Sequence, residues 1–170
     1  MKDFYHLFIE ELKEIHSAEC QSVKMMPEVI KAAKSSKLKE ALNAHLEETK
    51  SQVLRLERVA TELKESFSGA ECEPMEGLWK EWVHVVKSHY HDDVQDSAII
   101  GFIQKIKHYE ISVYGTLKTF AKHLQLHKVE VWLRESIKEE VMADKKLTEI
   151  AEGTMFAGGI NIKACKKHCA

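Results

Sequence analysis

Acidic side chains and one histidine recur on the otherwise apolar faces of the helices that this sequence predicts. They lie at the three- and four-residue steps that place side chains on one face of a helix. The set comprises Glu19, His45, Glu48, Glu110, Glu140 and Asp144. Within it, His45 and Glu48 form a His-x-x-Glu pair one helical turn apart. Carboxylates and an imidazole at such spacing are the side chains that hold iron or manganese ions in the core of a helical bundle.

The separations along the chain indicate that these side chains meet at one level of a bundle. Glu19 and Glu48 are nearly as far apart in sequence as Glu110 and Glu140, as two antiparallel hairpins require. An isolated ionised carboxylate costs several kcal/mol in an apolar core. Five of them need counter-charge or protons, and two divalent ions would supply +4 against −5. At each single position, an acid at the solvent margin of a helix or a bonded core histidine is the structural alternative.

Long amphipathic helices are the elements that must position these residues. Apolar residues recur at helical spacing over four segments, about Phe4–Lys34, Ser36–Gly69, Val94–Leu124 and His127–Glu152. The pair Ser35 and Ser36 offers an N-cap to the second segment, and Gly153 offers a stop to the fourth. We expect Pro27 to bend the first.

The connection between the second and third segments is long. Residues 69–93 contain Pro74, a short apolar stretch from Leu78 to Val86 and the polar run HYHDD, which together predict a crossover with one short helix. Two helical hairpins joined by such a crossover predict an all-α fold, a ferritin-like four-helix bundle. We assign residues 1–153 to this bundle and residues 154–170, where no helical period is sustained, to a flexible C-terminal tail.

The composition agrees with one helical domain and excludes several classes of function. The 170 residues include only 7 glycines and 2 prolines, too few for a many-stranded sheet. The net charge of −2 gives no reason to expect nucleic acid or anionic lipid as a partner. No apolar run is long enough to cross a bilayer, so we expect a cytoplasmic protein, in which the 4 cysteines form no disulfide framework. Glycine motifs for phosphate and signatures of an activated nucleophile are also missing.

Several stretches of the chain are specific enough to suggest a family. They are SAEC at Ser17, LKEALNAHLEETKSQVLRLE at Leu38, MEGL at Met75, KHYEISVYGTL at Lys107 and IKEEVMADKKLTEIA at Ile137. Together they resemble the bacterial YciE/YciF stress-protein family, a ferritin-like group related in fold to rubrerythrin. The resemblance covers nearly the whole chain to about Glu152. It implies a homodimer-forming four-helix bundle with a candidate two-metal site, whose inward acids and histidine correspond to Glu19, His45, Glu48, Glu110, Glu140 and Asp144.

One position departs from the family pattern. Members usually have Val-Glu-His-Tyr-Glu where this chain has IKHYE from Ile106 to Glu110, so Lys107 replaces an expected acid. If Lys107 points toward the cluster, its ammonium takes over part of the role of a metal ion. If it extends to solvent, the cluster loses one potential ligand. In both cases the resemblance no longer implies full occupancy by two metal ions.

Two functional interpretations follow. In the first, the core binds iron or manganese and oxidises ferrous iron or reduces peroxide. Glu48 and Glu140 would bridge the metal ions, and Glu19 and Glu110 would each bind one ion terminally. His45 and Asp144 would complete the coordination shell. In the second, the chain is a metal-free dimeric scaffold or stress-interaction protein in which Lys107 and shared protons neutralise the acids.

Other residues that could do chemistry have simpler explanations. Tyr114 shares a helix face with Lys107 and Glu110 and would be either a hydrogen-bonding neighbour of a metal or plain core. The sequence CKKHC in the tail has too few ligands for a closed zinc site. The HYHDD run fits a solvated loop, although it could bind a surface ion.

Overall fold

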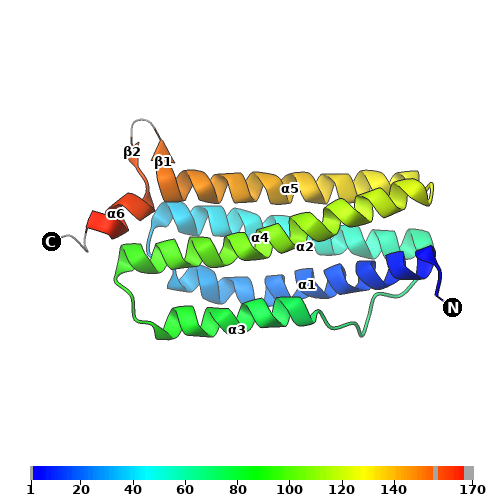
Figure 1. The fold of residues 1–170 in the computed structure, drawn as a ribbon, viewed down its shortest axis with the longest axis horizontal. Coiled ribbons are helices and arrows are strands. Elements are labelled where there is room, and N and C mark those ends of the chain that lie inside the picture. The colour runs from blue at the N-terminus through cyan, green and yellow to red at the C-terminus, as the bar shows by residue number, and fades with distance from the viewer. Residues whose placement is uncertain (1, 155–156, 167–170) are drawn as a thin grey trace.

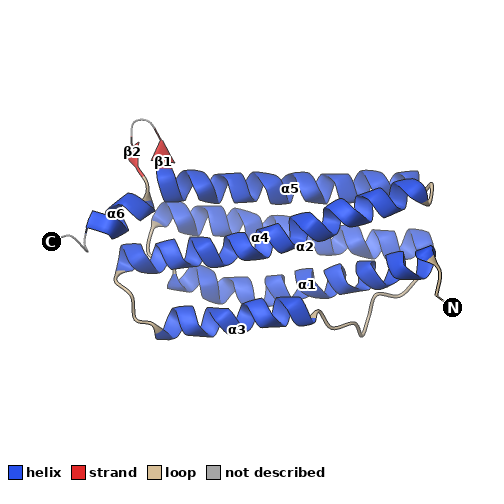
Figure 2. Cartoon of the chain, viewed as in Figure 1, coloured by secondary structure: helices blue, strands red, loops and turns tan. Residues whose placement is uncertain are grey.

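The computed structural model of the chain describes residues 2–154 and 157–166. Four long helices form a bundle: α1 (Phe4–Ala32), α2 (Ser36–Leu63), α4 (Asp92–His123) and α5 (His127–Glu152). A shorter helix, α3 (Glu73–Lys87), runs alongside the bundle in the connection from α2 to α4 and contacts α1 and α4 (Figure 1). The predicted all-α bundle with a long crossover is confirmed (Figure 2).

Local sequence signals set most of the helix ends. The Asp3 side chain accepts a hydrogen bond from the His6 amide at the start of α1, and Ser35 caps α2 by accepting one from the Leu38 amide. Gly153 ends α5 with a φ of 87°, in the left-handed region where glycine is favoured. The predicted stop of α2 near Gly69 is wrong, because Lys64 already adopts a left-handed conformation with a φ of 57°.

The turn between α1 and α2 is held from outside by α4. Asp96 is buried, and its two carboxylate oxygens accept hydrogen bonds from the amides of Lys34 and Ser35, each at 2.7 Å. These bonds pair backbone groups that a tight helix-to-helix connection would otherwise leave without partners. Asp96 therefore fixes the α1–α2 hairpin against the second hairpin.

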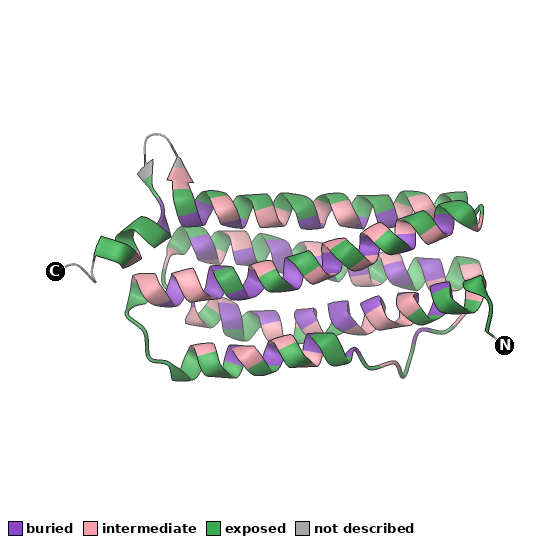
Figure 3. Ribbon diagram, viewed as in Figure 1, coloured by how far each residue is buried: buried purple, intermediate pink, exposed green. Residues whose placement is uncertain are grey.

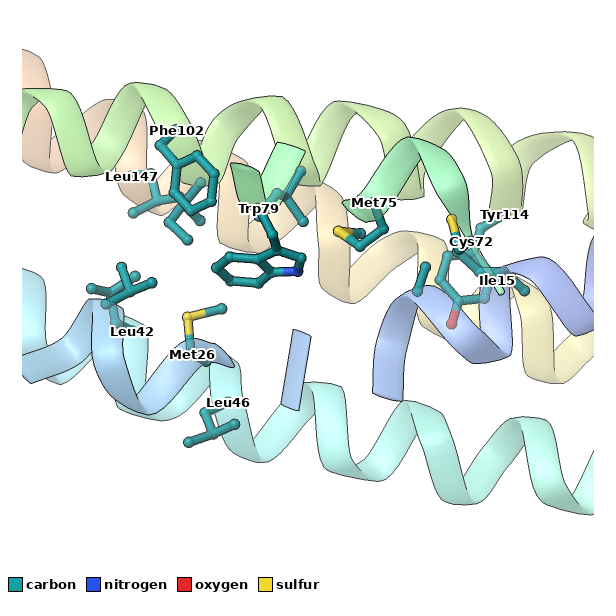
Figure 4. Packing of buried hydrophobic residues seen from close by; sticks show 14 of the residues in the cluster. Ile15, Met26, Leu42, Leu46, Cys72, Met75, Trp79, Phe102, Tyr114 and Leu147 are labelled. Carbon is teal, nitrogen blue, oxygen red and sulfur yellow. The ribbon is translucent and has the colours of Figure 1, made fainter. Parts of the chain in front are cut away.

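The crossover helix is longer than the apolar stretch predicted. It begins at Glu73, because Pro74 suits the first turn of a helix and Glu73 and Glu76 face its positive end. Trp79 and Trp82 of α3 pack against Phe102 of α4, with ring centroids 5.2 and 5.4 Å apart. Figure 4 shows Trp79 beside Phe102 in the apolar core. These aromatic contacts attach the crossover to the bundle.

The core runs along the facing stripes of the helices, where buried residues repeat on the inner faces (Figure 3). Pro27 lies within α1 without ending it. Among the described residues, none of the helices combines the length and the apolar character that a bilayer crossing requires.

Within residues 154–170, which the sequence assigned to a flexible tail, the structure describes regular elements. Strand β1 (Gly153–Thr154) pairs antiparallel with β2 (Ala157–Gly158), and helix α6 (Ile160–Lys166) follows. Ile160 is buried, and α6 contacts α4 and α5. A seven-residue helix is too short to show a helical period in sequence, and among its described residues Ile160 is the buried one. The CKKHC motif lies mostly outside the described residues.

Candidate functional site

A lysine ammonium stands at the centre of the acidic cluster that the sequence predicted. Lys107 of α4 forms ion pairs with Glu110, one turn further along the same helix, and with Glu140 of α5. All three side chains are 0% exposed. The lysine therefore points inward, and its charge is shared between carboxylates from two helices.

A third buried carboxyl group, from α1, lies beside this group. Glu19 accepts a hydrogen bond of 2.7 Å from the Tyr114 hydroxyl of α4, and both residues are fully buried. The Ser22 hydroxyl, one turn beyond Glu19, donates to Glu110 at 3.4 Å. Helices α1, α4 and α5 thus each contribute an acid to one level of the core, as the spacing predicted.

Helix α2 contributes the histidine. His45 is buried, and its Nε2 lies 3.4 Å from the Thr49 hydroxyl. Its Nδ1 lies 3.7 Å from a carboxylate oxygen of Glu48 and has no hydrogen-bond partner among the described residues. Burial lowers the pKa of His45, and the nearby Lys107 charge lowers it further, so the imidazole is neutral at pH 7.

Burial and the ammonium together set the charge of the cluster. Burial raises the pKa of Glu19 to about 8, with the Glu140 charge adding to the rise, and burial also raises the pKa of Glu110 well above 4.5. For Glu140 burial acts in the same direction, but the Lys107 ammonium outweighs it and lowers the pKa. Burial would lower the pKa of Lys107, but Glu110 and Glu140 outweigh it and raise the pKa.

At pH 7 the Lys107 ammonium therefore faces an ionised Glu140 carboxylate, while the raised pKa values of Glu19 and Glu110 shift both groups toward their protonated forms. The ammonium supplies counter-charge to Glu110 and Glu140, and the raised pKa values reduce the negative charge that the core must hold. This arrangement meets the requirement that buried charges be paired and hydrogen-bonded.

Two of the predicted ligands lie away from the centre. The Glu48 side chain is 45% exposed, although it neighbours His45. The Asp144 side chain is 21% exposed and accepts a hydrogen bond from Gln104 at 3.1 Å. Each sits at the solvent edge of the apolar face of its helix.

A possible metal-binding group remains among the buried residues. His45, Glu110 and Glu140 each place one potential ligand atom so that these atoms lie within 4.8 Å of one another. Both carboxylates of the group are ion-paired with Lys107. Three ligand atoms suffice for one ion, whereas the carboxylate-bridged pairs of helical bundles use a glutamate from each of two helices and a Glu/His pair from each of the other two. Among the described residues, His45 is the one buried histidine. The residues present fit one ion only after Lys107 releases them, and they do not fit two.

Sequence reasoning missed a second polar network between α2 and α5. Arg55 of α2 makes a bidentate ion pair with Glu139 and donates to the Ser136 hydroxyl at 2.8 Å. Gln52 also donates to Glu139 at 2.9 Å. Arg55 lies seven residues after Glu48, on the same edge of the α2 face, and its spacing alone gave no signal of a cross-helix partner.

Comparisons with known proteins agree with this architecture. Residues 3–158 match a family model described as a domain of unknown function, DUF892. Protein YciF of Escherichia coli K12 is 38% identical over 152 residues, which span 89% of this chain and 92% of that protein.

Solved structures give the same result. The crystal structure of the E. coli stress protein YciF superposes with a TM-score of 0.86 at 35% identity, covering 98% of this chain and 99% of that one. YcfI from Rhodopseudomonas palustris, provisionally described as a structural protein, gives 0.85 at 34% identity over 88% and 96% of the two chains. A Xanthomonas campestris protein at 18% identity, with a TM-score of 0.77 over 99% and 100%, shares the fold. The chain belongs to the DUF892 family.

Proposed function

We propose that this protein is a structural member of the stress-protein group, with a bundle core neutralised by its own lysine rather than by a pair of metal ions. The observation that carries the proposal is the pairing of the buried Lys107 ammonium with Glu110 and Glu140. The names of its relatives point the same way, since one is called a stress protein and another is provisionally described as structural.

The charge balance supports this proposal on physical grounds. A divalent ion that entered between Glu110 and Glu140 would have to displace an ammonium that its ion pairs with both carboxylates hold in place, or sit beside it with like-charge repulsion. The displaced Lys107 would have to find another partner, because a buried ammonium without one costs several kcal/mol. We expect iron and manganese to bind weakly, and we do not assign the chain an oxidation reaction.

A second candidate function rests on the group formed by His45, Glu110 and Glu140. If Lys107 swung away, these residues would hold a single divalent ion, for which their oxygen and nitrogen donors suit iron or manganese. Glu48, on the same helix as His45, is near enough to join them after a side-chain rotation.

Anaerobic calorimetric titration with Fe²⁺ and Mn²⁺ separates the two candidates. We expect the wild-type protein to bind neither ion tightly and Lys107→Glu, which removes the ammonium and adds a ligand, to bind at least one ion tightly. Lys105→Glu is the matched control, because Lys105 lies on the same helix and its side chain is 55% exposed. Tight stoichiometric binding by the wild type would favour the single-ion function, and no gain in Lys107→Glu would show that the lysine is not the obstacle.

We further propose, from the family resemblance, that the chain acts as a cytoplasmic homodimer. Apolar side chains exposed on α2 and α5, among them Leu54, Val131 and Met142, are consistent with a surface that a second copy covers.

A further inference from the structure

A cavity of about 280 Å³ opens between α2 and α5, next to the buried cluster, with which it shares His45. Its walls are mainly apolar and include Leu42 and Ala41 from α2, Ala143 and Leu147 from α5, and Ile103 from α4. Figure 4 shows Leu42 and Leu147 on facing helices. Dry apolar cavities of about 150 Å³ hold a benzene ring, so this one is large enough for a ring or a short alkyl chain.

Two hydrogen-bond acceptors stand side by side in the wall of this cavity. The Thr49 hydroxyl donates its single hydrogen to the His45 carbonyl oxygen at 3.0 Å, so toward Nε2 of the ring it can only accept. Nε2 therefore carries the hydrogen of the neutral imidazole, and Nδ1 presents a lone pair. That lone pair lies 3.7 Å from a Glu48 carboxylate oxygen, and both residues line the cavity.

Such a pair of acceptors requires a donor. The His45 side chain is only 6% exposed, and its Nδ1 has no hydrogen-bond partner among the described residues. Nδ1 is therefore a buried, unsatisfied hydrogen-bond acceptor. A hydroxyl has one hydrogen and cannot donate to both acceptors, whereas a primary ammonium has three. The Glu48 side chain, partly exposed, can rotate to make room for such a group.

We propose that this cavity binds a small primary amine, with its apolar body between α2 and α5 and its ammonium shared by His45 Nδ1 and the Glu48 carboxylate. At the mouth of the cavity, the positive charges of Lys37 and Lys146 offset the negative charge of Glu40. The selectivity for a cation therefore comes from Glu48 and the lone pair of His45 rather than from the general charge of the surface.

Benzylamine and benzyl alcohol, which share the ring and differ in the head group, test the proposal in amide-resolved NMR titrations of the full chain. We expect benzylamine to shift the amides of Ala143 and Leu147 with a millimolar dissociation constant, at least about tenfold tighter than benzyl alcohol. Equal affinity of the two compounds, or shifts spread over surface acids without those two amides, would overturn the proposal.

Two pairs of variants localise the site. Glu48→Gln should weaken benzylamine binding at least about fivefold, while Glu47→Gln, the same charge change on the neighbouring exposed acid, should leave it unchanged. Ala143→Leu fills the cavity and should abolish binding of both compounds, while Ala164→Leu in α6, outside the cavity, should not. Equal effects within either pair would contradict the assignment, and a native amide spectrum of Ala143→Leu confirms that its fold is intact.

Discussion

Replacing Lys107 by methionine should destabilise the protein strongly, because it removes the cation and keeps the carboxylates. Methionine has a similar length and no charge, so the main loss is the ion pairing with Glu110 and Glu140. Removing one partner of a buried ion pair costs about 3–5 kcal/mol, since the other charge is left uncompensated. We expect a loss of at least about 3 kcal/mol at pH 7, measured by urea unfolding followed by circular dichroism.

The loss of stability should also depend on pH, and the charges determine whether it grows or shrinks as pH rises. In the wild type, Lys107 lowers the pKa of Glu140, so the stability that this pairing contributes is present at neutral pH and is lost as pH falls below the usual range of a glutamate. In the variant, burial without the ammonium raises the pKa of Glu140, so the folded state binds an extra proton and loses stability as pH rises. The difference between the two proteins should therefore grow from pH 5 to pH 8.

Lys105→Met is the matched control. Lys105 lies on the same helix, but its side chain is 55% exposed and pairs with Glu81 at the surface, an interaction worth about 0–1 kcal/mol. A second substitution, Lys107→Met combined with Glu140→Gln, should recover part of the loss because it removes the unpaired charge. If Lys107→Met cost no more than Lys105→Met, or its cost did not change with pH, the ammonium would not be the counter-charge of the core.

Further predictions concern the remaining buried acids and the assembly. Between pH 5 and pH 9, the stability of Glu19→Gln relative to the wild type should rise by up to about 4 kcal/mol. Ionisation destabilises the folded wild type, because burial raises the pKa of the Glu19 carboxyl to about 8, whereas the glutamine amide does not ionise and still accepts a hydrogen bond from Tyr114. A stability difference in urea unfolding that did not change with pH would contradict this. Asp96→Ala should lower the free energy of unfolding by about 2–4 kcal/mol in the same assay, because the amides of Lys34 and Ser35 lose charged acceptors. A loss below about 1 kcal/mol would show that the α1–α2 hairpin does not need these hydrogen bonds. Light scattering after gel filtration should give twice the chain mass of 19.5 kDa, and a single-chain mass would refute the proposed homodimer.

The sequence predicted the bundle and the convergence of acids because both depend on helical periodicity. Glu19, Glu110 and Glu140 lie at the middle of wide apolar stripes, so a small error in the helix face does not move them to the surface. Glu48 and Asp144 lie at the edges of such stripes, where the packing of the neighbouring helix decides whether a side chain turns inward or toward water. Periodicity predicts which face of a helix is buried, but it does not predict which helix packs against that face.

The direction of Lys107 could not be decided from sequence for a related reason. A lysine has a long flexible stem that can place its charge in the core or in solvent. The choice depends on Glu140, which is 33 residues away in sequence and reaches the lysine only through the α4–α5 packing. The short helix α6 was missed because it spans seven residues and Ile160 is the buried one among those described, and a single buried residue has no period.

Elemental analysis of wild-type protein, purified without chelators and without added metal, tests the central claim most directly. Because Lys107 already balances the charge of the buried carboxylates, we predict iron and manganese far below one ion per chain. One or two tightly held ions per chain, retained through gel filtration, would mean that the lysine does not occupy the place of a metal and would contradict the account.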